Sequence, residues 1–366
     1  MKKIRIALMT HTMDNRPGMG TATVARKTVE GLVADDQFDV TFVHYEKIAD
    51  PLYERAREIV IPPLPELFFG TRFLRFLLFC WKYRKENFDI VHWFQPRLYP
   101  FFWLFPARNI VITAHGGGDA LAPQKFSLSK KIFVFIFRHF HSRIDAVVAS
   151  SNSGKKEIIE AYGIPENKIV VIYLGGSEGF SPLEKRSAAN PYILTVSRLV
   201  PHKNVGGLIR AYALARNMGI SQRLIIVGGR GGAEESVYAE ARRSPYRSDI
   251  MFVDYAPLED LKALYAGADL FVFPSLNEGW GMPIIEAFAS GVPVVATNLT
   301  AVPEAVGDAA LLVDPRDERA LAGAMAQVLT DKSLSERMVQ AGFVQASKFT
   351  WDRMARAVTE VYKKLI

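Results

Sequence analysis

The chain has 366 residues, of which 49% are apolar and 23% charged, and carries a formal net charge of +7. Its length suits two domains better than one compact core, and its composition excludes an intrinsically disordered protein. The single cysteine, Cys80, excludes an internal disulfide framework and a cysteine-ligated metal site, and it is typical of a reducing cytoplasm.

No apolar run approaches the roughly 20 residues that span a bilayer. The longest runs, 98–106 and 132–137, are too short. The start of the chain, MKKIRIALMTH, is basic and then apolar, but it contains Arg5 and leads into a glycine loop instead of a cleavage site. We interpret it as a first buried strand and expect a cytoplasmic protein without a transmembrane segment.

Short apolar runs alternate with helical patterns along both halves of the chain. Such runs lack polar alternation, which is typical of buried parallel strands. The fold class predicted is therefore α/β, with two doubly wound, Rossmann-like parallel-sheet domains facing across a cleft. After Asp314 the chain is mainly helical, and the polar stretch 175–191 is the predicted linker. In chain order, strands are predicted at 4–10, 39–45, 89–94, 109–115, 146–151, 192–197, 223–229, 250–255, 270–275, 293–298 and 310–314, and helices at 22–33, 73–85, 154–163, 205–217, 258–267 and 282–291.

Basic and aromatic residues are concentrated between 64 and 143. This stretch holds twelve Lys and Arg against four Asp and Glu, and 20 of the 42 aromatic residues. Basic charge interleaved with Phe and Trp favours a peripheral membrane contact over nucleic-acid binding. An aromatic core with solvated basic rims explains the same composition, and both interpretations stay open.

Two segments at predicted strand ends carry features of a phosphate site. Gly18-Met19-Gly20 follows the first strand and lets backbone N–H groups approach a phosphate, but alone it is a weak signal and not the Gly-x-Gly-x-x-Gly of dinucleotide binding. Arg198 closes a strand, and Lys203 stands five residues later, just before a helix. Two cations at such a junction suit a diphosphate, and a solvated surface pair is the simpler alternative.

Two carboxylates flank a predicted helix start in NEGWGMPIIEAF. We place Glu286 in the first turn of this helix, where a glutamate alone is an ordinary capping residue. Glu278 precedes the helix in a glycine-flanked loop and is not a cap. A carboxylate can accept two hydrogen bonds from the vicinal hydroxyls of a sugar, and the backbone of Gly279-Trp280-Gly281 can approach a ligand closely.

The stretch from Asn277 to Pro315 resembles the signature of retaining glycosyltransferases of family four, which have the GT-B fold. Glu278 and Glu286 match the Glu-x7-Glu motif of that family, and GVPVVATN and VPEAVGDAALLVDP also resemble it. Arg198 and Lys203 match its diphosphate-binding pair, and Gly18-Met19-Gly20 its first glycine loop. The resemblance is strong over the second half of the chain and weaker between about 45 and 110.

The resemblance implies roles for these residues. Glu286 would bind the ribose and Glu278 the donor sugar, while Arg198 and Lys203 stabilise the departing diphosphate. The active-site His of the family corresponds best to His115, at the end of a predicted strand. The sequence contains no Asp-x-Asp, so no metal and no other cofactor is expected.

The resemblance also implies the domain plan and the reaction. We expect an acceptor-side domain at 1–180, a nucleotide-sugar-binding domain at 181–345, and a helix at 346–366 that crosses back to the first domain. The expected enzyme is a metal-independent, retaining hexosyltransferase that uses UDP- or GDP-hexose and a lipid-linked or cell-envelope glycan acceptor on the inner face of the cytoplasmic membrane.

Other functions remain compatible with the same residues. A nucleotide-sugar epimerase or hydrolase would use the donor without an acceptor sugar, and a non-catalytic nucleotide-sugar binding module would only hold it. A nicotinamide dehydrogenase is disfavoured because the glycine fingerprint is missing.

Overall fold

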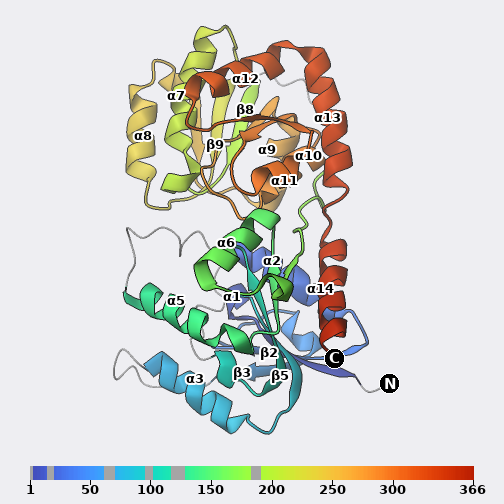
Figure 1. The fold of residues 1–366 in the computed structure, drawn as a ribbon. Coiled ribbons are helices and arrows are strands. Elements are labelled where there is room, and N and C mark those ends of the chain that lie inside the picture. Colours follow the sequence, from blue (N-terminus) through green and yellow to red (C-terminus); the bar gives the residue numbers. More distant parts are fainter. Residues whose placement is uncertain (1–2, 15–19, 62–70, 95–101, 117–127, 183–190) are drawn as a thin grey trace. The chain divides into compact units, whose positions relative to one another are not determined.

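The computed structural model describes residues 3–14, 20–61, 71–94, 102–116, 128–182 and 191–366 (Figure 1). The chain divides into two compact units. Unit 1 comprises Met1–Leu174 and Trp351–Ile366, and unit 2 comprises Gly175–Thr350. The division thus falls a few residues from the expected boundaries at 180 and 345.

Unit 1 is built on a parallel sheet, which has seven strands in its described part, in the order β3-β2-β1-β4-β5-β6-β7. From β1 the chain adds β2 and β3 toward one edge of the sheet and then β4 to β7 toward the other edge. The switch point therefore lies between the neighbouring strands β1 and β4. The strands are β1 (Ile4–Met9), β2 (Phe38–His44), β3 (Arg57–Val60), β4 (Phe88–Trp93), β5 (Ala107–Ala114), β6 (Ala146–Ala149) and β7 (Ile169–Val171). The α-helices are α1 (His11–Asp14), α2 (Gly20–Val33), α3 (Thr71–Lys82), α5 (Leu128–Phe140), α6 (Asn152–Tyr162) and α14 (Trp351–Leu365).

Two layers of helices cover the sheet of unit 1. Phe76 of α3, Phe137 of α5 and Ile158 of α6 belong to one hydrophobic cluster with the strands. Helix α14 packs on α2, where a Cβ atom at Gly31 would lie 2.4 Å from the Cβ atom of Ala355. Glycine is therefore required at position 31 for this close approach.

Helix α14 is also bonded to the sheet through a buried histidine. The Nδ1 atom of His92, on β4, lies 2.5 Å from the hydroxyl of Tyr362, and its Nε2 atom lies 2.8 Å from Oγ1 of Thr113 on β5. Burial lowers the pKa of His92 to about 3, so the imidazole is neutral and joins the two elements as a donor and an acceptor.

Unit 2 is built on a second parallel sheet, with six strands in its described part, in the order β10-β9-β8-β11-β12-β13. The direction of addition reverses between β8 and β11. The strands are β8 (Tyr192–Val196), β9 (Arg223–Val227), β10 (Ile250–Val253), β11 (Leu270–Phe273), β12 (Val294–Thr297) and β13 (Ala310–Val313). The α-helices are α7 (Val205–Asn217), α8 (Glu234–Arg243), α9 (Leu258–Gly267), α10 (Met282–Ala289), α11 (Val302–Val306), α12 (Glu318–Thr330) and α13 (Lys332–Ala346).

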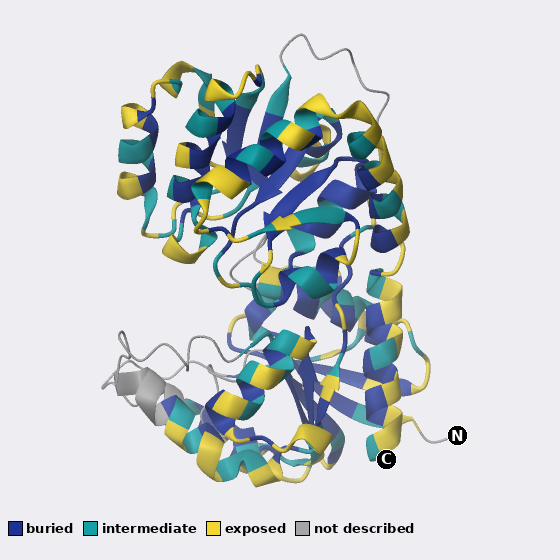
Figure 2. Ribbon diagram, turned by 45° about the horizontal axis from the view of Figure 1, so that its top comes forward, coloured by how far each residue is buried: buried dark blue, intermediate teal, exposed yellow. Residues whose placement is uncertain are grey.

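The central strands of both sheets are largely buried, as Figure 2 shows. Burial on both faces explains why their sequences are apolar runs without alternation. The prediction of two parallel-sheet α/β domains is therefore confirmed. It missed the short edge strands β3 and β7 and, among the longer helices before Asp314, α5 and α8.

None of the helices in the described ranges combines the length and the apolar character that a bilayer span requires.

Candidate functional site

The carboxyl ends of β8 and β11 form the switch point of the sheet of unit 2, where ligands bind in doubly wound folds. The loop after β8 carries Arg198, and a 3-10 turn at Pro201–Lys203 ends on Lys203. The loop after β11 carries Glu278. A backbone hydrogen bond from Leu276 to the carbonyl of His202, 2.7 Å long, joins these loops. The structure thus brings the residues expected to bind diphosphate and donor sugar to one edge.

Lys203 and Glu278 form an ion pair at this edge. The Lys203 Nζ atom lies 2.5 Å from Glu278 Oε1, and the two side chains are only 17% and 13% exposed. The ammonium also lies 5.1 Å from the ring centroid of Phe273. The backbone N–H of Glu278 donates to Oγ1 of Thr300 over 3.0 Å, which fixes the loop. Each charge is held in a partly buried position by the other.

Arg198 differs from Lys203 because its side chain is exposed and forms no ion pair among the described residues. Its Nη2 atom donates to the carbonyl oxygen of Arg230 over 3.2 Å. The backbone positions of Leu199 and Arg230 form an isolated parallel bridge, which continues the β8–β9 pairing beside the arginine. An uncompensated guanidinium at a strand end is suited to bind an anion.

Glu286 does not cap a helix. Helix α10 begins at Met282, so Glu286 lies in its second turn, and the prediction of a first-turn position was wrong. The helix starts there because the preceding residue, Gly281, has φ +146°, which is not helical. Residues with a side chain rarely adopt this backbone conformation. Glu286 Oε2 accepts a hydrogen bond from the Tyr265 hydroxyl over 2.8 Å.

Burial raises the pKa of Glu286 to about 7, and the hydrogen bond from Tyr265 partly opposes this rise. Tyr265 lies on α9 and is fully buried, with its ring edge-to-face against Phe180 at 5.5 Å. Desolvation of a carboxylate costs free energy, so a glutamate with this environment in a helix interior is unusual for a purely structural side chain. Tyr265 was not among the predicted site residues.

The turn Gly279-Trp280-Gly281 contributes backbone to this edge. The Trp280 side chain is 3% exposed and packs edge-to-face on Phe349, with ring centroids 4.9 Å apart. The indole therefore belongs to the core of unit 2. A role of Trp280 in substrate binding would have to come from its main-chain atoms.

Three buried hydroxyls follow or end strands at this edge and were also missed. Thr195 is the last residue but one of β8, and Ser197 and Ser275 follow β8 and β11. Their oxygen atoms have no hydrogen-bond partner within the described residues. Buried hydroxyls normally find a partner, so these groups are available to a polar ligand at the switch point. A serine shortly after the end of each of two buried strands was the signal in the sequence.

Two predicted residues lie in unit 1 and are described there. His115 directly follows β5 and is half-buried, and burial lowers its pKa to about 4, so the ring is neutral at physiological pH. Its carbonyl oxygen accepts a hydrogen bond from Ser150 over 3.3 Å. Gly20 is the exposed first residue of α2, and Gly18 lies outside the described residues.

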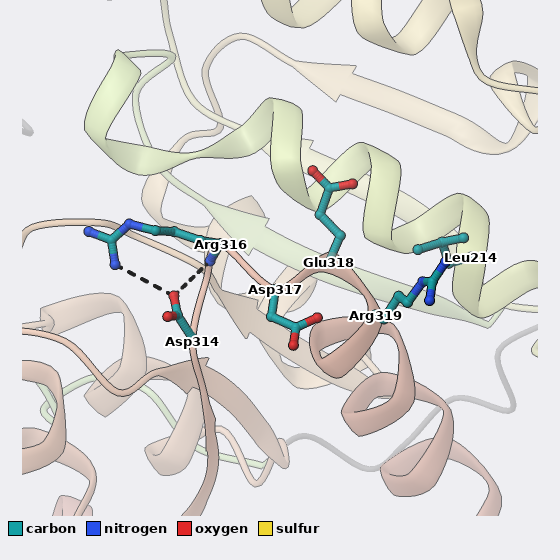
Figure 3. A pocket seen from close by; sticks show the side chains of 6 residues that line it. All are labelled: Leu214, Asp314, Arg316, Asp317, Glu318 and Arg319. Atoms are coloured by element: carbon teal, nitrogen blue, oxygen red, sulfur yellow. Dashed lines mark hydrogen bonds and ion pairs between the residues drawn. The ribbon is translucent and has the colours of Figure 1, made fainter.

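A separate surface pocket lies at the start of α12 (Figure 3). Two of its charged pairs and caps are already formed: Arg316 contacts Asp314 at 3.6 Å, and Asp317 accepts from the backbone of Ala320 at 2.9 Å to cap α12. No predicted site residue lines it, so we do not assign it a ligand. The lining residues are Leu214, Asp314, Arg316, Asp317, Glu318 and Arg319.

The two parallel sheets, each with a switch point, define a doubly wound α/β protein of two units. Residues 19–175 match the family model described as Glycosyltransferase Family 4, and residues 180–345 match the model described as Glycosyl transferases group 1. The chain therefore belongs to this glycosyltransferase family, which has the GT-B fold.

Individual relatives agree with this membership. The chain is 34% identical over 245 residues to the O-antigen chain mannosyltransferase B of Escherichia coli. The aligned region covers 63% of this chain and 64% of that protein. Two solved structures share the fold. The sucrose-phosphate synthase of Thermosynechococcus elongatus has a TM-score of 0.79 at 22% identity, covering 99% of each chain. HepE of Anabaena, solved in complex with UDP and glucose, has a TM-score of 0.78 at 20% identity, covering 99% of this chain and all of the other.

Proposed function

We propose that this protein is a glycosyltransferase that moves a hexose from a nucleotide diphosphate sugar to a cell-envelope glycan acceptor. The observation that carries the proposal is the arrangement at the switch point of unit 2. Exposed Arg198, the Lys203–Glu278 pair and the partly buried Glu286 all occur within the elements that meet at this edge. Cations and sugar-binding carboxylates at one strand edge are what a nucleotide sugar requires.

Each residue has a proposed role in this reaction. Arg198 forks two N–H groups toward the diphosphate, and Lys203 adds a point charge, so both stabilise the negative charge that develops on the leaving group. Glu278 accepts hydrogen bonds from the hydroxyls of the transferred sugar, and Glu286 from those of the ribose. These two cations act in place of a metal, and transfer with retention of the anomeric configuration is the outcome that the family resemblance favours.

The two carboxylates are suited to different tasks. Glu278 forms an ion pair with Lys203. A bound diphosphate would attract the Lys203 ammonium, and this would release the Glu278 carboxylate for hydrogen bonding to the sugar. Glu286 receives only one hydrogen bond, from Tyr265, in the described structure. A carboxylate has capacity for further donors, and two neighbouring hydroxyls would satisfy it.

The identity of the sugar rests on the relatives. The E. coli relative is named as an O-antigen chain mannosyltransferase, and HepE was solved with UDP and glucose. We propose mannose or glucose as the transferred sugar and a lipid-linked or polysaccharide acceptor, with peripheral contact to the membrane through the basic aromatic stretch 64–143. His115 and Gly20 stay predicted contributors from unit 1.

Product analysis with a panel of UDP-, GDP-, ADP- and dTDP-sugars tests the proposal. Donor-dependent glycosylation of an envelope glycan acceptor is expected, and Glu286→Ala and Lys203→Ala should abolish it while the exposed Glu235→Ala of α8 does not. Turnover of the donor without any acceptor would instead favour an epimerase or hydrolase. Donor binding without turnover under all conditions would favour a binding module, and unchanged turnover in Glu286→Ala would contradict the assigned site.

A further inference from the structure

Helix α3 has apolar side chains on two opposite faces. Phe76 and Phe79 point into the hydrophobic cluster of unit 1 and are at most 2% exposed. Leu74, Leu78 and Trp81 are 42%, 48% and 65% exposed. Their spacing of four and then three residues aligns them in one stripe along the outer face of the helix. A surface helix normally carries polar residues on that face, so the stripe is an apolar surface without a partner in the described structure.

Cations border the C-terminal end of this stripe. Lys82, Arg84 and Lys85 are exposed. The guanidinium of Arg84 lies 4.5 Å from the ring centroid of Trp81 and donates a hydrogen bond of 2.7 Å to the Trp81 carbonyl oxygen. The charge thus lies directly over the exposed ring, the position of a cation at the edge of an apolar surface.

The nearest acidic residue in the sequence does not neutralise these cations. Glu86 is bound by Arg57 at 2.8 Å and by Arg5 at 2.9 Å. These contacts hold the pKa of Glu86 below its usual value, so its charge is balanced by arginines outside α3. Helix α3 itself contains no Asp or Glu. The outer face and its C-terminal edge are therefore apolar and positive.

Two other elements of the same hydrophobic cluster also expose apolar side chains. Leu104, in the 3-10 turn Phe102–Leu104, is 46% exposed, and Phe135 of α5 is 67% exposed. Both elements belong to the cluster that holds α3: Phe102 packs on Phe137 of α5 with centroids 5.4 Å apart. The exposed groups thus stand on elements that are fixed by one core.

We propose that the outer face of α3, formed by Leu74, Leu78, Trp81, Lys82, Arg84 and Lys85, binds the surface of a bilayer that contains anionic lipids. The leucines and the indole enter the boundary between headgroups and acyl chains, where Trp is favoured. The cations lie at headgroup level and contact lipid phosphates.

Charge decides between a bilayer and a second copy of this chain. In a two-fold dimer through this face, the second copy would present the same apolar and positive surface, and α3 has no Asp or Glu to neutralise the three cations. An anionic lipid surface neutralises them instead. The inference deepens, and in that respect rests on, the membrane contact proposed above for the stretch 64–143. Its residues all belong to α3 and the turn after it in unit 1, so its test is independent of the donor site and of glycosyl transfer.

Vesicle sedimentation of the full chain tests the inference without donor or acceptor. We expect the protein to sediment with phosphatidylglycerol-containing vesicles, and much less with pure phosphatidylcholine. Binding should fall steeply toward about 1 M salt, where the Debye length is about 3 Å instead of about 10 Å. Trp81→Ser and Leu78→Ser should each weaken binding at least about tenfold. Lys82→Gln and Lys85→Gln should each weaken it about fivefold.

Matched controls lie on α13 of unit 2. Val344 is 62% exposed, so Val344→Ser removes an equally exposed apolar side chain, and Lys332→Gln removes a cation whose side chain is 90% exposed. Neither should change vesicle binding. Failure of the wild-type protein to bind anionic vesicles at low salt would overturn the inference, as would wild-type binding by both Trp81→Ser and Leu78→Ser. A dimer that Trp81→Ser dissociates, with no vesicle binding, would assign the face to self-association instead.

Discussion

The hydroxyl of Tyr265 donates a 2.8 Å hydrogen bond to Glu286, although the two residues lie on different helices, α9 and α10, of unit 2. Tyr265 is fully buried and Glu286 is partly buried, and burial raises the pKa of each. The phenol therefore stays protonated and remains a donor, which fixes the direction of the hydrogen bond. This contact orients the carboxylate that we assign to the ribose.

Tyr265→Phe removes that hydrogen bond and little else. The bond favours the ionised form of Glu286, so its loss should raise the pKa of the carboxyl further above its usual value. We expect the donor KM to increase about threefold to tenfold with a smaller change in kcat, since a hydrogen bond of this kind contributes about 1 kcal/mol. Tyr246→Phe, which removes a surface hydrogen bond to Asn217, is the control for steady-state kinetics. Equal loss of kcat and an unchanged KM would argue against a positioning role.

The pH dependence of donor binding should follow Glu286. With a pKa of about 7, the carboxyl of the free protein is mainly protonated at pH 6 and mainly ionised at pH 8. The ionised form accepts more hydrogen bonds from ribose hydroxyls, so the donor KM should fall about tenfold over this interval. Glu286→Gln should give a weaker and nearly flat profile, whereas the exposed Glu235→Gln should retain the wild-type slope. A wild-type slope in Glu286→Gln would assign the titration to another group.

Lys203 and Glu278 should depend on each other for stability. Lys203→Ala leaves a partly buried carboxylate uncompensated, so the free energy of unfolding of unit 2 should decrease by about 1–3 kcal/mol. The double variant Lys203→Ala/Glu278→Ala should lose less than the sum of the single variants, with a coupling of at least about 0.5 kcal/mol in urea unfolding.

The exposed Lys332–Glu336 pair, 3.8 Å apart, provides the matched control cycle, and its coupling should be close to zero. If the Lys203–Glu278 cycle were equally additive, the ion pair would not be a stable feature of the protein.

The buried His92 should make unit 1 sensitive to acid. Its pKa is about 3 in the folded protein and about 6.5 when unfolded, because burial disfavours the charged imidazole. Between these values the unfolded state binds the additional proton, so stability is full above pH 6.5 and decreases as the pH falls, by up to about 1.4 kcal/mol per pH unit. His115, with a pKa of about 4, contributes in the same direction.

Urea unfolding of unit 1 at several pH values between about 4 and 7 measures this dependence. His92→Gln can retain hydrogen bonds to Tyr362 and Thr113 without titrating, so its slope should be smaller than that of the wild type. The exposed His139→Gln should leave the slope unchanged. An identical slope in His92→Gln would show that other groups cause the acid sensitivity.

The sequence was sufficient for the architecture because central parallel strands are buried on both faces and form apolar runs. Short edge strands lack this signature: β3 has the sequence REIV, with two charged residues in four. Helix α5 contains IFVFIF, and a short continuous apolar run does not distinguish a helix from a strand.

For the candidate site, spacing and chemistry placed Arg198, Lys203 and Glu278 at one sheet edge. Two features depended on tertiary structure. The backbone of Gly281 sets the start of α10 at Met282, and Glu286 therefore lies in the second turn instead of the first. The partnership of Tyr265 with Glu286 joins residues 21 positions apart and has no local pattern.

Donor-induced stabilisation of the wild type and of Arg198→Ala tests most directly the claim that the switch point of unit 2 binds a nucleotide diphosphate sugar. Arg198 is exposed and forms one side-chain hydrogen bond, so its loss should not affect folding. At about 100 times Kd, the preferred donor should stabilise the wild type by about 2.7 kcal/mol. Arg198→Ala should lose most of this gain, and Arg319→Ala, in the pocket at the start of α12, should retain it. Equal stabilisation of Arg198→Ala and wild type, or none in the wild type by any nucleotide sugar, would contradict the account.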